Sequence, residues 1–426
     1  MQKRTIKTCL LLGYVLLLLA PDTFGQLPPP VVYPVVYSDA YNIGLALGRN
    51  FCGDGPTQMI RSLVDRDYPA SEIVSPEVVD PAEFLRIHNR DYLTSLRKPS
   101  ILANITGIST LADVDSDTLT TDLLNPLCAT VSGTVTACYS ALERGIAINL
   151  GGGYHHAHRA RGSGINLYAD IPFALTELWK TEHNLRILIV DLDAQYGSGL
   201  VSMLGEEFKK EHPRVGFFGI CRDASCTMTA KGSATREGTY GHEVVSDVLS
   251  CYFIGGGVEK ATYTNILYTH LIPMIWQFKG DEERAPMLII YIAGSNVSSG
   301  HSVGFKFSSA DVVARDLFVV GAARECHVPI AILYSSIYDE RCLEAITQSL
   351  RAVLAYKPPE MIPFTRVDTV DSVAATASAP EFGREDTESN AHTDRMRSEV
   401  ASAPEVPVVD PSEFGCFCGL KRKKKK

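Results

Sequence analysis

The stretch "RILIVDLDAQYGSG", residues 186–199, begins as an apolar run and ends in carboxylates and glycines. Residues 187–190 are all aliphatic, which is typical of a strand buried on both faces of a sheet. Asp191 and Asp193 close this run, and Gln195 stands where the spacing of a metal site would favour histidine. The stretch therefore predicts a buried strand that delivers two carboxylates to a loop.

Further apolar strands alternate with helical patterns over residues 36–355. This alternation predicts an α/β domain with a mainly parallel central sheet and helices on both faces. The pattern Ser308-x-x-Asp311 is typical of a helix start. We expect strands at 145–150, 186–193, 214–220, 286–294 and 328–336, and helices at 167–180, 308–326 and 339–354.

Composition suggests four segments in the 426 residues. Residues 1–25 predict a signal peptide, because Lys3, Arg4 and Lys7 precede an apolar stretch. Residues 26–35 form a Pro-rich leader, residues 36–356 one folded domain, and residues 357–426 a disordered tail. Hydrophobic residues make up 45%, enough for a large core, and the net charge of −9 argues against nucleic-acid binding.

The two ends of the chain suggest different locations. The predicted signal peptide favours the secretory pathway or the extracellular space. The terminal "KRKKKK" could instead bind an anionic membrane, act as a nuclear signal, or be a solvated charge run. We weight the N-terminal pattern more heavily. The cysteine spacings show no small-domain disulfide framework, so most cysteines are expected to be core thiols.

Polar side chains cluster after the expected strands. Ligands of a parallel α/β sheet bind at the carboxyl ends of its strands. Asp191 and Asp193 could alternatively cap a turn, and Tyr338 could be an ordinary core residue. The candidate site residues are His155, His156, Asp191, Asp193, Asn296 and Tyr338.

"NLGGGYHHAHRARGSGINLYADI" (149–171) and "IVDLDAQYGSG" (189–199) resemble the zinc-dependent histone deacetylases, most closely their class IV branch. "VVYSDAYN" (35–42), "YIAGSN" (291–296) and Tyr338 fit the same order, so the resemblance covers about residues 35–355. It implies an arginase/deacetylase-like three-layer fold. It also implies hydrolysis of an acylated amine by a zinc ion.

The resemblance also implies roles for the candidate residues. His155 and His156 match a tandem general base and acid, and Asp191 matches the carboxylate that orients a histidine. Asp193 matches the first zinc ligand. Tyr338 matches the hydroxyl that stabilises the oxyanion.

The sequence departs from the family pattern at the remaining positions. Gln195 replaces the zinc-binding histidine and Asn296 the last zinc-binding aspartate. Neutral amides are weak zinc ligands. Even the loss of a residue that only hydrogen-bonds to a metal ligand lowers metal affinity roughly 10–100-fold. Four supporting positions also differ from the pattern, namely Ser198, Ser336, Ile337 and Ile165.

The sequence therefore predicts a degenerate family member that has lost tight zinc binding and acts as a binding or interaction protein. No cofactor is expected. The alternative is a working amidohydrolase that uses zinc or another divalent ion, held by Asp193, Gln195, Asn296 and a bound water. An arginase-like dimetal site would need more carboxylates than these loops supply. The partner could be a small acylated amine or a protein, and secretion would remove histones as targets.

Two glycosylation sequences remain unused by this interpretation. They are Asn104-Ile105-Thr106 and Asn296-Val297-Ser298. Asn296 is expected to lie in a pocket and stay unmodified, whereas Asn104 is the better acceptor in a secreted chain.

Overall fold

The computed structural model describes residues 32–43, 55–66, 68, 72–208, 214–222, 240–246, 249–254, 259–279, 287–298, 304–337 and 340–356. The expected signal peptide and tail lie outside these residues, as does most of the Pro-rich leader. Their boundaries stay predictions. The chain divides into two compact units, Met1–Val32 and Tyr33–Lys426, and every element described below belongs to the second.

The second unit is built on a nine-stranded sheet with the order β2-β1-β3-β9-β8-β4-β5-β7-β6. Paired strands run parallel, except that β6 runs antiparallel to β7 at one edge. The strands are β1 (Val35–Val36), β2 (Ile73–Val74), β3 (Ile146–Asn149), β4 (Arg186–Asp191), β5 (Val215–Arg222), β6 (Tyr240–Ser246), β7 (Leu249–Ile254), β8 (Met287–Gly294) and β9 (Ile330–Ser335).

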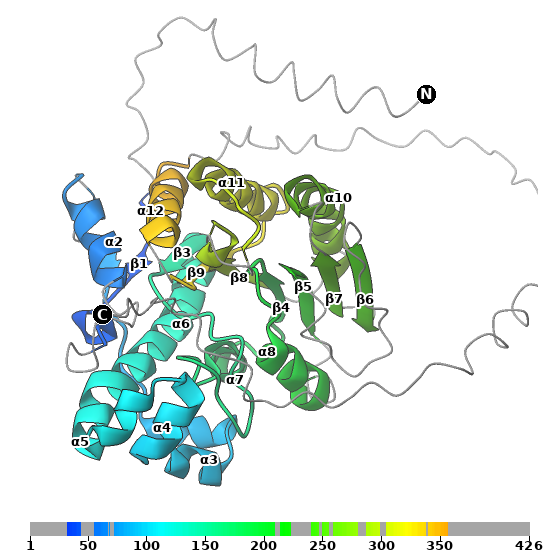
Figure 1. Cartoon of the computed structure of the whole chain (residues 1–426). Coiled ribbons are helices and arrows are strands. Elements are labelled where there is room, and N and C mark those ends of the chain that lie inside the picture. Colours follow the sequence, from blue (N-terminus) through cyan, green and yellow to red (C-terminus); the bar gives the residue numbers. More distant parts are fainter. Residues whose placement is uncertain are drawn as a thin grey trace, which may run out of the picture. The chain divides into compact units, whose positions relative to one another are not determined.

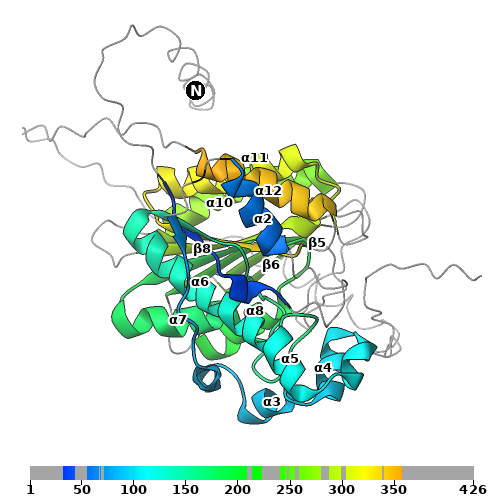
Figure 2. The same cartoon turned by 90° about the vertical axis from the view of Figure 1, so that its left-hand side faces the viewer.

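Helices cover both faces of this sheet, as Figures 1 and 2 show. One face carries α2 (Gly55–Val64), α10 (Glu259–Lys279), α11 (Ser309–Glu325) and α12 (Glu340–Leu354). The other carries α6 (Asn125–Arg144), α7 (Asp170–Thr181) and α8 (Ser198–Met203), with α3 (Arg90–Ser95), α4 (Pro99–Thr106) and α5 (Ser116–Leu119) on the same side. Short 3-10 or π segments span Asp39–Tyr41, Pro81–Arg86, Ser109–Asp113, Thr120–Leu124, Leu204–Phe208 and Ser295–Ser298.

Each face of the sheet has its own hydrophobic core. Successive side chains of a strand point to opposite faces. Along β4, Ile187 and Ile189 enter the core shared with α6 and α7, and Leu188 and Val190 enter the core shared with α10, α11 and α12. All four residues of the aliphatic run 187–190 are therefore buried in a core, because both faces of β4 are covered.

The predicted α/β fold, with its mainly parallel sheet between two helical layers, is confirmed. All five expected strands are present, and their ends differ from the expected ones by one or two residues. The helix expected from residue 167 begins only at Asp170. The sequence analysis did not predict the β6–β7 pair, α10 or the helices between residues 55 and 144. Among the helices that the structure describes, none combines the length and apolar character that crossing a membrane requires.

Helix α11 begins with the predicted capping box. The Ser308 hydroxyl accepts a hydrogen bond from the Asp311 backbone N–H, and the Asp311 carboxylate accepts one from the Ser308 N–H. These bonds satisfy donors that a helix N-terminus leaves unpaired.

Replacing Ser308 by alanine should therefore destabilise the protein by about 1 kcal/mol, because one cap bond is lost. Chemical denaturation measures this change. Ser309→Ala, one residue further into the helix, is the matched control and should stay within about 0.5 kcal/mol of the wild type. Equal effects of the two substitutions would contradict the capping role.

Candidate functional site

The candidate site lies at the carboxyl ends of four strands that are neighbours in the sheet, β3, β9, β8 and β4. His155 and His156 follow β3, and Asp191 and Asp193 close β4. Asn296 lies in the 3-10 turn Ser295–Ser298 after β8. Parallel strands bring these chain segments to one edge of the sheet. Tyr338 lies outside the described residues, so its predicted role stays a prediction.

His155 and Asp191 form a buried pair. The His155 Nδ1 lies 2.8 Å from Asp191 Oδ2, and both side chains are nearly inaccessible to solvent. Gly197 makes this approach possible, because a Cβ there would lie 2.9 Å from His155 Nδ1 and 2.8 Å from Asp191 Oδ2. The Asp191–His155 pairing that the family resemblance implies is thus present in the structure.

The charge of His155 follows from its neighbours. Burial lowers the pKa of His155, but the carboxylates of Asp191 and Asp193 outweigh burial and raise this pKa to about 9. The ring is therefore an imidazolium at neutral pH. Its Nε2 lies 3.8 Å from Asp193 Oδ1, so one buried cation stands between two carboxylates.

Asp193 already receives hydrogen bonds on both carboxylate oxygens. Its Oδ1 accepts from the Asn296 side-chain amide at 2.7 Å and from the Gln195 backbone N–H at 2.8 Å. Its Oδ2 accepts from the Ser336 hydroxyl at 2.5 Å. Protein donors therefore occupy three of the roughly four lone-pair positions through which this carboxylate would bind a cation.

Asn296 is held at both ends of its amide. The side chain is fully buried, and its Oδ1 accepts from the Ala194 backbone N–H at 2.9 Å while its Nδ2 donates to Asp193. Since the backbone N–H can only donate, the amide orientation is fixed. Asn296 thus presents a donor to Asp193 and keeps its only side-chain acceptor turned toward the backbone.

Gln195 and His156 form the more accessible part of the site. Both side chains are partly buried, and Gln195 lies close enough to His156 to influence its pKa. The rings of His155 and His156 lie 4.2 Å apart between centroids. Burial and the charge of His155 lower the pKa of His156 well below its usual value. The tandem histidines therefore differ in charge, with His155 cationic and His156 neutral.

Ser336 reaches Asp193 from an unusual backbone conformation. Its φ of 62° lies in the left-handed region, which costs a non-glycine residue about 1 kcal/mol. The Ser295 hydroxyl donates to the Ser336 carbonyl at 2.7 Å and the Ser335 carbonyl at 3.1 Å. Ser336, one of the four supporting positions that differ from the family pattern, is thus held in place by hydrogen bonds, and its own side chain enters the site.

Asp170 was missed as a supporting residue, although it lies in the quoted motif "YADI". It is buried, and its carboxylate accepts from the Gly153 and Tyr154 backbone N–H groups at 2.7 and 2.8 Å and from the Thr134 hydroxyl at 2.7 Å. Gly153 has a φ of 71°, which an ordinary side chain would disfavour. Asp170 therefore fixes the loop that carries the tandem histidines.

Arg315 was also missed, and it supports the opposite side of the site. Its buried guanidinium donates to the carbonyls of Leu192 and Gly294 at 3.1 and 2.8 Å, and to the Asp316 carboxylate at 2.7 Å. These carbonyls belong to the segments that position Asp193 and Asn296. A charged pair inside the apolar sequence "VVARDLFVV" is the signal that could have revealed it.

The side chains at this site fit a zinc ion poorly. Zinc prefers imidazole, thiolate and carboxylate ligands, and Asp193 is the only such group among the three expected ligand positions. Within the described part of the chain, no cluster of three or more His, Cys, Asp or Glu side chains is arranged to hold a metal ion.

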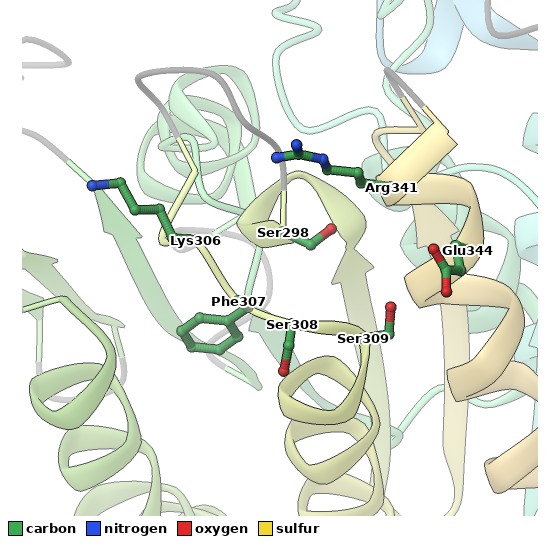
Figure 3. Close-up of a pocket in the computed structure, with 7 residues that line it drawn as sticks. All are labelled: Ser298, Lys306, Phe307, Ser308, Ser309, Arg341 and Glu344. Carbon is green, nitrogen blue, oxygen red and sulfur yellow. The ribbon is translucent and has the colours of Figure 1, made fainter.

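A separate cavity of about 310 Å³ lies where α11 and α12 begin (Figure 3). Its lining includes Ser298, Lys306, Arg341 and Glu344. Lys306 and Arg341 are exposed, and the Lys306 side chain points away from Arg341 in Figure 3. The two positively charged side chains do not point toward a common position, so this cavity is not arranged to bind an anion.

Comparisons with known proteins agree with the fold. Residues 56–354 match the family model described as "Histone deacetylase domain". The chain is 27% identical to "Histone deacetylase 2" of Arabidopsis thaliana over 323 residues, which is 74% of this chain and 77% of that protein. It is 31% identical to "Acetoin utilization protein AcuC" of Staphylococcus aureus over 222 residues, 49% of this chain and 53% of that protein. It is 30% identical to human "Histone deacetylase 1" over 138 residues, 31% of this chain and 28% of that protein.

The raised pKa of His155 predicts a pH dependence of stability. The ordinary pKa of 6.5 applies to the unfolded chain, and the folded pKa is about 9. A raised pKa contributes stability that is complete below the unfolded pKa and is lost as pH rises through the folded pKa. The free energy of unfolding should therefore fall by roughly 3 kcal/mol between pH 6.5 and 9.

Denaturation at a series of pH values measures this slope. His155→Gln should flatten it, whereas the exposed His183→Gln should leave it unchanged. His88 does not interfere, because burial lowers its pKa to about 4 and its contribution changes only below pH 6.5. If the wild type and His155→Gln showed the same slope of stability against pH, His155 would not be an imidazolium at neutral pH.

Proposed function

The chain belongs to the histone deacetylase family, and we propose that it is a degenerate member that serves as a binding or interaction protein rather than a hydrolase. The observation that carries this proposal is the hydrogen bonding of Asp193. Its two oxygens accept from Asn296, Gln195 and Ser336, which are the groups that replace or accompany the family's zinc ligands.

A metal ion would have to compete with these bonds for Asp193. Each contributes roughly 0.5–1.5 kcal/mol net, and more where one partner is charged. The gain would be one carboxylate ligand and two amides, a set that zinc binds weakly. The imidazolium of His155 adds a cost, because a cation placed beside Asp193 would be repelled by it.

A binding role is compatible with the two residues at the accessible part of the site, His156 and Gln195. The neutral His156 and the amide of Gln195 lie at the accessible part of the site, where they can donate and accept hydrogen bonds without a metal. Such groups suit a small acylated amine or a polar segment of a partner protein. The net charge of −9 argues against a nucleic-acid partner.

The proposed location is the secretory pathway or the extracellular space. The basic and apolar pattern of residues 1–25 supports it. The terminal Lys/Arg run is proposed to contact anionic membranes, with a nuclear location as the alternative if residues 1–25 are not a signal peptide.

The second candidate function is a metal-dependent amidohydrolase with an altered site. The intact His155–Asp191 pair favours it, because this pair could still orient a base. A hydrolase would release acyl groups from lysine or polyamine-like amines. It would require Asp193 to exchange its protein donors for a metal ion.

Metal content separates the two candidates. We expect the wild-type protein, dialysed and analysed by elemental mass spectrometry, to carry well under one equivalent of zinc and to release no acetate from an acetyl-lysine peptide. Stoichiometric metal together with turnover that is lost in His155→Ala would overturn the proposed function.

A rebuilt ligand set provides a second test. Gln195→His, Asn296→Asp and Ser336→Gly together should create zinc affinity, because they supply two ligands and remove the hydroxyl that blocks Asp193. Zinc at 100 times its Kd should then stabilise the triple variant by about 2.7 kcal/mol and leave the wild type unchanged. Thermal denaturation with and without zinc measures the difference.

Asn296→Asp alone should lower the stability of the protein. Asparagine and aspartate have nearly the same shape, but the new carboxylate would face Asp193 Oδ1 at about the present 2.7 Å without a donor between them. We expect lower stability without metal, since like charges repel. Asn104→Asp, the same change on an exposed helix face, is the control. Equal zinc responses in all variants would show that these residues do not form one site.

A further inference from the structure

The sequence contains two Asn-x-Ser/Thr sequences, and the structure treats them in opposite ways. Asn296-Val297-Ser298 lies in the candidate site, and Asn104-Ile105-Thr106 ends helix α4. Such a sequence is an acceptor for N-linked oligosaccharide only where the asparagine can carry a bulky, solvated group.

Asn296 cannot carry such a group in this fold. Its side chain is fully buried, and its Nδ2, the atom that would bear the sugar, donates to Asp193 at 2.7 Å. The Ser298 side chain is also buried and donates to the Ser295 carbonyl at 2.7 Å. A sugar on Asn296 would remove the bond to Asp193 and would have no space.

Asn104 lies on the solvent face of α4. Positions 100 and 104 are both exposed, and residues four apart lie on one helix face. Leu102 and Ala103 face the hydrophobic core instead. An oligosaccharide on Asn104 would therefore extend into solvent without disturbing the packing of α4.

We propose that Asn104 is an N-glycosylation site of this chain and that Asn296 is not. This inference rests on the proposed entry into the secretory pathway. The Asn104 Nδ2 forms a bond to the anomeric carbon of a polyprenyl-pyrophosphate oligosaccharide. The bond from that carbon to the pyrophosphate oxygen breaks, polyprenyl pyrophosphate leaves, and the amide nitrogen loses one proton.

The folded geometry also sets the order of events. The Thr106 hydroxyl is buried and donates to the Leu102 carbonyl at 2.7 Å. It is therefore committed to the helix once α4 has formed. Transfer to Asn104 precedes the folding of α4, when the hydroxyl is free to assist, whereas a chain modified at Asn296 could not complete the fold of the site and is therefore absent from the folded protein.

The test is expression of the full chain, with its own N-terminus, in a eukaryotic cell. Peptide N-glycosidase in ¹⁸O-labelled water converts each glycosylated asparagine into labelled aspartate, which peptide mapping locates. We expect label at position 104, none at position 296, and an enzyme-sensitive mobility shift of one glycan.

Asn104→Gln and Thr106→Val should each abolish the shift, and Thr106→Val keeps the asparagine while preserving the shape of the buried side chain. Ser298→Ala, which removes the other acceptor sequence, should leave the shift unchanged. An unlabelled position 104, or label at position 296, would overturn the inference. Neither outcome would affect the proposed loss of zinc binding, which is measured on unglycosylated protein from bacteria.

Discussion

The structure of the site depends on how one buried carboxylate, Asp193, is satisfied. A buried charge is costly unless it is paired and hydrogen-bonded. In the family pattern a metal ion would provide that pairing. Here the Asn296 amide, the Ser336 hydroxyl and the Gln195 N–H provide the hydrogen bonds, and the His155 imidazolium provides the opposite charge. Asn296 and Ser336 are therefore mutually consistent, because each places a side-chain donor on Asp193, whereas the Gln195 bond comes from the backbone.

The surrounding fold holds these groups in place through polar contacts beneath the loops. Asp170 binds the backbone of the loop that carries the histidines, and Arg315 binds carbonyls beside Asp193 and before Asn296. Ser295 holds the loop after β9. These contacts hold the loops at the carboxyl ends of the strands around Asp193. In our proposal this combination yields a preorganised polar site without hydrolysis.

The sequence was sufficient for the central strands and for the identities of most site residues. Strands such as β4 and β8 are buried on both faces, so their uninterrupted aliphatic runs were unambiguous. The β6–β7 pair was missed because its sequence, "YGHEVVSDVLSCYFI", mixes polar and apolar residues at the sheet edge. The exchange of donors at Asp193 could not be predicted, because it depends on the φ of Ser336 and the amide orientation of Asn296. Asp170 and Arg315 were missed because most of their partners are backbone groups, which the sequence pattern does not identify, although the charged pair Arg315–Asp316 in an apolar run was a visible signal.

The central claim is that protein donors fill the position that a metal would occupy beside Asp193. Crystals grown with excess zinc and measured on both sides of the zinc absorption edge test it most directly. We expect no anomalous peak within bonding distance of Asp193, and an Asn296 Nδ2 that remains about 2.7 Å from Asp193 Oδ1. A strong peak bonded to Asp193, Gln195 and Asn296, with the Asn296 amide turned so that its oxygen faces the metal, would contradict the claim.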